Sequence, residues 1–212
     1  MNICIGIISY LPNNKLKRYR RLKKLNDLID SCNNLFNLPI TIIAQNWEND
    51  RLQNTTNVNI IYFKDKLGIV GARKALRDEF LKSNYNYLIM LDDDCELSGD
   101  SESAIKYIKQ IELHPGMCGL FSGTVLKLFA ISKELFSLVN YGDGNVEDGD
   151  FFEDILFVNT IKKKFPNRVF TFNRHNLKQK SNNFNDKDST WYWGQYNKHD
   201  IGDRTRKILG DL

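Results

Sequence analysis

Short, unbroken apolar runs alternate along the chain with amphipathic segments of helical period. The apolar runs, rich in isoleucine, leucine and valine, cover residues 3–9, 40–45, 58–63 and 87–91. Runs of this length without polar alternation are typical of strands that are covered on both faces of a parallel sheet. Apolar positions spaced three and four residues apart predict helices over residues 16–36, 72–82, 101–113, 133–139 and 151–164.

The order of these elements predicts an α/β fold. Strand, helix, strand, strand, helix and strand follow one another over residues 3–91. With buried apolar strands, this order indicates a mostly parallel, doubly wound sheet with flanking helices. Beyond it, residues 117–131 predict one or two strands with a turn near Ser122 and Gly123, and residues 168–172 predict an edge strand.

The length of 212 residues favours one domain over residues 1–212. Within it, we expect a ligand-binding half at residues 1–97 and a second half at residues 98–172. Residues 173–212 are polar and weakly periodic apart from the aromatic segment WYWGQY at 191–196. A long segment of this kind is expected to form a tail or lid over the site.

Composition and charge narrow the classes of ligand. The chain is 42% hydrophobic, enough for a core, and its net charge of +4 suits an anionic ligand such as a nucleoside diphosphate. Lysine and arginine are spread along the chain, which disfavours a nucleic-acid partner. The basic block at residues 15–24 fits either an acidic partner or, as we favour, the solvated face of a helix.

The cysteines and the apolar runs indicate the cellular compartment in which the protein is expected. No two of the four cysteines share a CxxC spacing, so a zinc site is not expected. Cys4 and Cys32 fall on apolar positions and predict small core residues, and reduced thiols fit a cytoplasmic protein. No apolar run reaches about 18 residues, so no membrane span is expected. The initial ICIGII run lacks the basic leader of a signal peptide.

Three consecutive carboxylates, Asp92, Asp93 and Asp94, follow the apolar run at residues 87–91. Adjacent carboxylates repel one another, and oxygen ligands suit a hard cation such as Mg²⁺ or Mn²⁺. In open α/β sheets, ligands bind at the carboxyl ends of strands where the strand order reverses. If the first and fourth strands are neighbours there, Ser9 and Tyr10 face the aspartates. The alternative is a solvated acidic turn.

Two ordered segments resemble a known family. GIVGARKAL at residues 68–76, followed by YLIMLDDDCEL at 87–97, is similar to GT-A-fold nucleotide-sugar glycosyltransferases of the family-2 type. Members carry a Gly-x-x-x-Ala-Arg-Asn-like segment and then a strand ending in an Asp-x-Asp motif, and Lys74 stands here where asparagine is common. EDILF at 153–157 resembles the Glu-Asp pair that opens the acceptor-side helix of inverting members.

The resemblance covers residues 3–165 and implies an activity. It implies metal-dependent transfer of a sugar from a nucleoside-diphosphate sugar, UDP-linked or similar. The expected acceptor is a hydroxyl group on a glycan, a lipid-linked sugar or a protein. Bound Mn²⁺ or Mg²⁺ would stabilise the diphosphate leaving group.

The resemblance also implies a set of metal ligands. Asp94 is the expected direct ligand, with Asp92 as a second ligand close to the ribose. Asp93 would contact the sugar or the ion. Some family members use a late histidine as a third ligand, and His199 is the candidate here, ahead of His175.

The nucleotide and the acceptor have their own expected contacts. By analogy with the family, the nucleotide pocket is lined by residues at the ends of the first two strands and by the helix after the third, namely Ser9, Tyr10, Gln45, Asn46 and Arg73. Arg73 either approaches the diphosphate or pairs with the aspartates.

In an inverting reaction the acceptor hydroxyl loses its proton as it attacks, and a carboxylate within hydrogen-bond reach can take it. Asp154 is the first candidate for this base and Glu153 the second. The alternative is that the two acids only stabilise the start of a helix.

Other functions remain open at this point. Sugar transfer to a hydroxylated DNA base would require duplex binding with steep salt dependence. A nucleotidyltransferase would carry a basic, glycine-rich signature after the first strand, which SYLPNN at residues 9–14 lacks. A non-catalytic nucleotide-sugar-binding module would release no diphosphate from a nucleotide sugar.

Overall fold

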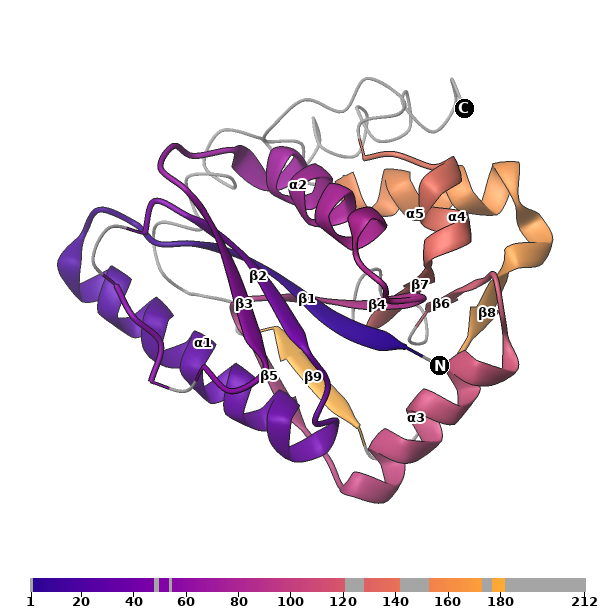
Figure 1. Cartoon of the computed structure of the whole chain (residues 1–212), viewed down its shortest axis with the longest axis horizontal. Coiled ribbons are helices and arrows are strands. Elements are labelled where there is room, and N and C mark those ends of the chain that lie inside the picture. The colour runs from indigo at the N-terminus through magenta and orange to yellow at the C-terminus, as the bar shows by residue number, and fades with distance from the viewer. Residues whose placement is uncertain are drawn as a thin grey trace, which may run out of the picture.

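The protein is built on a seven-stranded sheet (Figure 1). The computed structural model describes residues 2–47, 50–53, 55–120, 128–141, 153–172 and 177–181. The strand order is β3-β2-β1-β4-β7-β6-β8. The strands are β1 (Ile3–Tyr10), β2 (Ile40–Gln45), β3 (Val58–Phe63), β4 (Tyr87–Asp92), β6 (Cys118–Leu120), β7 (Phe129–Ser132) and β8 (Val169–Thr171).

Most neighbouring strands of this sheet run parallel. β1 pairs in parallel with β2 and β4, β2 with β3, and β6 with β8. β7 is antiparallel to both β4 and β6. The predicted mostly parallel sheet is therefore confirmed, and the chain's order reverses between β1 and β4, which is where ligands bind in such sheets.

Helices cover both faces of the sheet (Figure 1). One buried cluster joins α1 and α3 to one face, and a second joins α2, α4 and α5 to the other. Side-chain oxygens of Asn14, Asp100 and Ser132 accept from backbone N–H groups in the first turns of α1, α3 and α4. The helices are α1 (Lys15–Leu35), α2 (Gly68–Lys82), α3 (Ser101–Leu113), α4 (Lys133–Leu138) and α5 (Glu153–Lys164), with a 3₁₀ turn, η1 (Pro166–Arg168).

The central position of β1 in the sheet explains why the sequence of this strand is so apolar. All residues from Ile3 to Ser9 are buried, because α1 lies over one face of the strand and α2 over the other. Gly6 allows the close approach of α2, since a Cβ atom there would lie 2.8 Å from the Leu76 methyl carbons. Burying each isoleucine side chain of the strand contributes about 1.5–3 kcal/mol.

Two features differ from the sequence expectations. Helix α2 begins at Gly68 rather than Ala72, so the glycine-containing segment expected to be a turn forms the first turn of the helix. Gly68 itself has a φ of 73°, a left-handed conformation that favours glycine. A second sheet pairs β5 (Cys95–Ser98) with β9 (Lys178–Ser181) in antiparallel register, with Cys95 opposite Ser181. The two strands are far apart in the sequence, so the pattern of either segment alone does not predict their pairing.

Two simpler expectations concern membranes and thiols. Within the described ranges, no helix is long and apolar enough to cross a bilayer. All four cysteines are buried and free, as the apolar positions of Cys4 and Cys32 predicted.

Candidate functional site

The three aspartates lie where the strand order reverses. Asp92 ends β4 and pairs in register with Ile8 of β1, so Ser9 and Tyr10 extend beside the aspartates as expected. Asp93 and Asp94 form the turn that joins β4 to β5. The site is therefore built on two central strands, which fix its backbone more firmly than a surface loop would.

Asp93 points into the protein and is held there by α1. Its side chain is 6% exposed, and its Oδ1 atom lies 3.2 Å from Nη2 of Arg21. Burial raises the pKa of Asp93, while Arg21, the Ser9 hydroxyl and the Tyr10 backbone N–H act in the opposite direction. Neither Ser9 Oγ nor Asp93 Oδ2 meets full hydrogen-bond geometry with a partner among the described residues. Asp93 is thus a charged group inside the fold whose main partner is Arg21.

Asp92 faces outward and pairs with α2. Its Oδ1 atom accepts a hydrogen bond of 3.2 Å from Nη2 of Arg73. Arg73 is buried, whereas the Asp92 side chain is 40% exposed. The Arg73 guanidinium also lies 5.7 Å from the centre of the Tyr141 ring, within range of a cation–π contact. The pairing of Arg73 with an aspartate, one of its two expected roles, is present.

Asp94 differs from its two neighbours in having no ion pair among the described residues. Asp92 pairs with Arg73, and Asp93 pairs with Arg21. Burial, followed by the charges of Asp93 and Asp92, raises the pKa of Asp94 to about 7. When Asp94 ionises, the three carboxylates outnumber the two paired arginines, so a cation at this point would stabilise the ionised form of Asp94.

A cation at this point would meet a suitable donor set. Ligand atoms of Asp92, Asp94 and Cys95 lie within 4.8 Å of one another. The two carboxylates suit Mg²⁺ or Mn²⁺, and the Cys95 thiol is a softer donor that those ions favour less. The residues therefore fit a divalent cation held chiefly by Asp92 and Asp94. Asp93, the middle residue, is outside this group.

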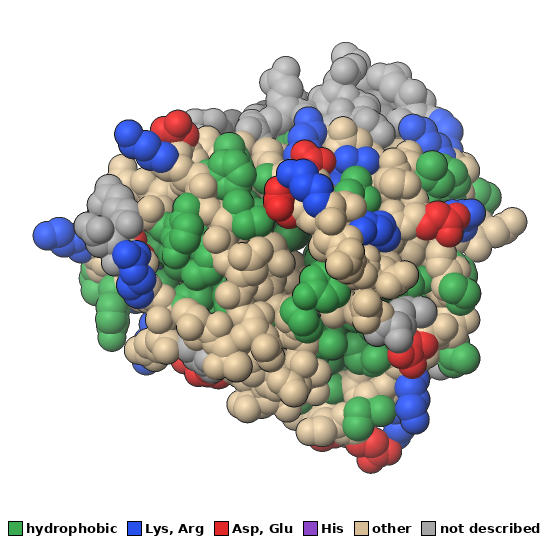
Figure 2. All heavy atoms as spheres, in the orientation of Figure 1, with side chains coloured by type: hydrophobic (Ala, Val, Ile, Leu, Met, Phe, Trp, Pro, Cys, Tyr) green, Lys and Arg blue, Asp and Glu red, His purple; other side chains and the backbone are tan. Residues whose placement is uncertain are grey.

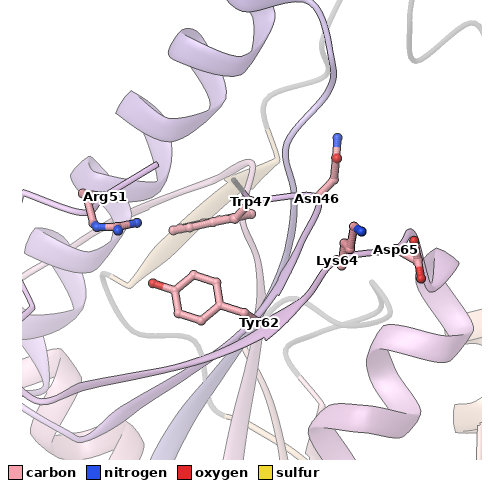
Figure 3. A pocket seen from close by; sticks show the side chains of 6 residues that line it. All are labelled: Asn46, Trp47, Arg51, Tyr62, Lys64 and Asp65. Carbon is pink, nitrogen blue, oxygen red and sulfur yellow. The ribbon is translucent and has the colours of Figure 1, made fainter. Parts of the chain in front are cut away.

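A hollow of about 890 Å³ opens beside the ends of β2 and β3 (Figure 3). Trp47 and Tyr62 form aromatic walls, with ring centres 6.2 Å apart in an edge-on arrangement. This volume lies within the range of pockets for small-molecule ligands. The remaining lining residues are polar or charged: Asn46, Arg51, Lys64 and Asp65.

Asn46 connects this hollow to the end of β1. Its amide nitrogen donates to the Leu11 backbone oxygen at 2.7 Å and to Asn13 Oδ1 at 2.8 Å. Gln45, the residue before it, is buried, and its Oε1 atom accepts from the Leu67 N–H at 2.8 Å. Gln45 therefore fixes the loop that leads into α2, while Asn46 lines the hollow.

Aromatic contacts lead from the aspartates to α5. The Tyr141 ring that lies near Arg73 also stacks on Phe157, with ring centres 4.0 Å apart and an angle of 11°. Phe157 lies one turn beyond Asp154 in α5, so the half-buried Asp154 is a near neighbour of this stack. Glu153 is the first residue of α5.

The structure brings most of the expected site residues to one edge of the sheet. Residues of the first strand, the aspartates and Arg73 meet there, and Gln45 and Asn46 lie on the adjacent strand end. Glu153 and Asp154 open α5, linked to this edge by the aromatic stack. His199 and His175 lie outside the described residues.

Sequence reasoning missed Arg21 and Tyr141. Arg21 belongs to the basic block that was interpreted as a solvated face, yet it precedes Leu25, Leu28 and Cys32 at intervals of four, three and four. That spacing places Arg21 on the buried face of α1 and was readable from the sequence. Tyr141 gave no such signal, because it follows the end of a short helix and its stacking partner Phe157 lies in another helix.

Comparisons with known proteins agree with this topology. No family model matches the chain, and no curated protein matches it in sequence. Among solved structures, TarS of S. aureus, residues 1–349, superposes with a TM-score of 0.53 at 12% identity, covering 84% of this chain and 59% of TarS. The same TarS fragment in complex with UDP-GlcNAc gives a TM-score of 0.54. The chain thus spans less than two thirds of that fragment, and 36% of a longer TarS structure.

Two further structures match over most of their length. A Desulfovibrio desulfuricans protein assigned to the nucleotide-diphospho-sugar transferases has a TM-score of 0.50 at 12% identity, with 81% of this chain and 80% of that one covered. A cytidylyltransferase of Leptospira borgpetersenii has a TM-score of 0.55 at 10% identity, with 100% and 95% covered. At such identities the likeness concerns the fold. The chain has the GT-A-like fold of nucleotide-diphospho-sugar transferases.

Proposed function

We propose that the protein is a metal-dependent glycosyltransferase that moves a sugar from a nucleoside-diphosphate sugar, UDP-linked or similar, to an acceptor hydroxyl. The observation that carries this proposal is the position of Asp94. It is an aspartate without a direct cationic partner in the described part of the chain, at the reversal of strand order. A nucleotide-sized hollow lies two to three strands away along the same edge of the sheet.

In this proposal Asp94 and Asp92 hold Mn²⁺ or Mg²⁺. When bound, the ion supplies positive charge to the diphosphate as negative charge develops on it during departure from the sugar. Arg73 keeps Asp92 in its outward position through their 3.2 Å hydrogen bond. Its own charge lies close enough to the same point to favour the anionic leaving group.

The nucleoside half of the donor is assigned to the ends of β1 and β2. Strands in a sheet are about 4.8 Å apart, so the ends of β2 and β3 lie about 10–14 Å from that of β4. A diphosphate at the aspartates therefore leaves room for a nucleoside that reaches toward Asn46 and the hollow it lines. Ser9 and Tyr10 lie between the two points, and Gln45 supports the loop behind them.

Proton removal from the acceptor is assigned to Asp154, with Glu153 as the second candidate, in an inverting reaction. The stack of Tyr141 on Phe157 supports this assignment because it packs the first part of α5 against the side of Arg73. The acceptor is proposed to be a hydroxyl of a glycan, a lipid-linked sugar or a protein. His199 is retained as a proposed third metal ligand.

A donor screen tests the function. Nucleotide sugars are incubated with the protein, with and without Mn²⁺, and release of the nucleoside diphosphate is measured beside thermal stability. We expect one class of nucleotide to raise the melting temperature of the protein only when the metal is present. We also expect the protein to release the nucleoside diphosphate slowly from the corresponding nucleotide sugar. A complete panel without stabilisation or release would refute the proposal.

Cytidylyl transfer is the second candidate, because the cytidylyltransferase structure matches the whole chain. The segment after β1 argues against it. Leu11, Pro12, Asn13 and Asn14 contain no glycine and no basic residue, and Asn14 serves as the cap of α1. Release of pyrophosphate from CTP, rather than of a nucleoside diphosphate from a nucleotide sugar, would favour this second reaction.

A further inference from the structure

Arg21, like Arg18 beside Asp50, is a partly buried basic residue of α1 that pairs with an aspartate. Its neighbours Arg20 and Lys23 are exposed, whereas the Arg21 guanidinium reaches the aspartate turn from the face of the sheet that α1 covers. Arg21 thereby connects α1 to the β4–β5 turn, in which Asp93 and Asp94 are the two central residues.

The pair with Arg21 decides which way Asp93 faces. Asp93 is 4% exposed, and burying a carboxylate without a cation is strongly unfavourable. Without Arg21, Asp93 is expected to move to water or toward a bound cation. In a turn of two residues such a movement also moves Asp94, because the two share a peptide unit.

We propose that Arg21 is a positioning residue for the metal site. It holds Asp93 inside the fold, and so keeps Asp92 and Asp94 as a two-carboxylate ligand pair whose atoms lie within 4.8 Å of each other and of Cys95. Three consecutive aspartates then act as two ligands separated by one anchor. The inference rests on the proposed metal role of Asp92 and Asp94, and it assigns Asp93 to support rather than to contact with the sugar or ion.

The test measures Mn²⁺ affinity by electron paramagnetic resonance, with no substrate present. Arg21→Met keeps an unbranched apolar stem and removes the charged guanidinium group. We expect Mn²⁺ affinity to fall by about 10- to 100-fold, as for other residues that orient metal ligands. Arg21→Lys keeps the charge but not the planar donor group, and is expected to lose less.

Two controls separate positioning from general loss of stability. Arg20→Met removes the exposed neighbouring charge and is expected to leave the affinity unchanged. Leu28→Ala destabilises the same helix at a buried site remote from the aspartates, and should also bind Mn²⁺ like the wild type, measured well below its melting temperature. The double variant Arg21→Met, Asp93→Asn removes both charges and is expected to recover most of the affinity lost in Arg21→Met.

The outcomes are distinct. Wild-type affinity in both Arg21→Met and Arg21→Lys would overturn the inference while leaving the metal site intact. An equal loss in Leu28→Ala would overturn it as well, because stability alone would then explain the effect. Absence of Mn²⁺ binding by the wild-type protein would refute the proposed metal site and this inference together.

Discussion

Two arginines approach the same run of aspartates from opposite faces of the sheet. In one pair the aspartate is the buried member, and in the other pair the arginine is. On the α1 face, Asp93 is hidden and Arg21 is partly exposed, at 6% and 30% side-chain exposure. On the α2 face, Arg73 is hidden at 4% and Asp92 is exposed at 40%. Both pairs are 3.2 Å long. A buried acid serves the fold, whereas an acid held outward by a buried arginine is available to a ligand.

The largest expected effect tests whether the chemistry belongs to the α2 face. Asp154 lies on that side, next to the aromatic stack of Tyr141 on Phe157. Asp154→Asn is expected to lower the rate of sugar transfer by about 10²–10⁴-fold, the usual contribution of a general base. Donor affinity, measured by calorimetry, should stay nearly unchanged. Asp78→Asn, an equal charge change at an exposed position of α2, serves as the control.

Full transfer activity in Asp154→Asn would remove it from the role of base and direct attention to Glu153. A parallel loss of donor affinity would instead indicate a structural role at the start of α5.

The next effect concerns Asp94, which follows Asp93 in the turn after β4. Asp94→Asn is expected to lower metal-dependent turnover by about 10²–10³-fold, because a preorganised charge at the leaving group is lost. Asp92→Asn should also lower metal-dependent turnover, but by less, since Arg73 already offsets the charge of Asp92. Initial rates over a range of Mn²⁺ concentrations measure both. Equal effects of the two substitutions would contradict the special position of Asp94.

Sequence reasoning was sufficient for the frame of this site and for its acidic residues. The apolar run of β1 and the run that ends at Asp92 had lengths and compositions that predict buried parallel strands, and the structure pairs them. The sequence left it as a condition that these two strands are neighbours, and the parallel pairing of β1 with β4 meets that condition. Helix α2 was also predicted, with an error of four residues at its start because Gly68 was taken for a turn.

The orientation of individual side chains was not predictable in the same way. Nothing in three identical neighbours says which aspartate turns inward, because this depends on a cation supplied by α1 from across the sheet. The strands β5 and β9 are joined by a pairing between residues 95–98 and 178–181, and neither segment has a pattern of its own. Contacts between distant segments decided both features.

Stability measurements sharpen the contrast between the two pairs. Arg21→Met removes the partner of a buried carboxylate, so Asp93 must either stay buried uncompensated or leave its place in the turn, and we expect the free energy of unfolding to fall by about 3–5 kcal/mol. Arg73→Met leaves Asp92 in contact with water, and its cost should be about 1 kcal/mol. Denaturant titrations of both variants measure the difference. A larger loss in Arg73→Met would reverse the assignment of the two faces.

A smaller effect is expected from pH. The pKa of Asp94 is raised to about 7 from its ordinary value of 3.8, so the folded protein keeps a proton that the unfolded chain loses between these values. Without metal, the free energy of unfolding should therefore fall as pH rises from about 4 to about 7, and level off above. The raised pKa of Asp93 acts in the same direction.

Denaturation of the metal-free protein at pH 5 and pH 8, beside Asp94→Asn, measures this dependence. The variant should lose part of the slope and be more stable than the wild type at pH 8. An unchanged slope in the variant would assign the proton uptake to other groups. Because protons and the cation compete for Asp94, Mn²⁺ affinity of the wild type should also weaken below about pH 7.

The most direct measurement is a calorimetric titration of UDP into the wild-type protein with Mn²⁺, without Mn²⁺, and into Asp94→Asn with Mn²⁺. If Asp94 holds the ion that binds the diphosphate, UDP affinity should be high in the first titration and at least about tenfold lower in the other two. Equal UDP affinity in all three would contradict a metal-held diphosphate at the end of β4.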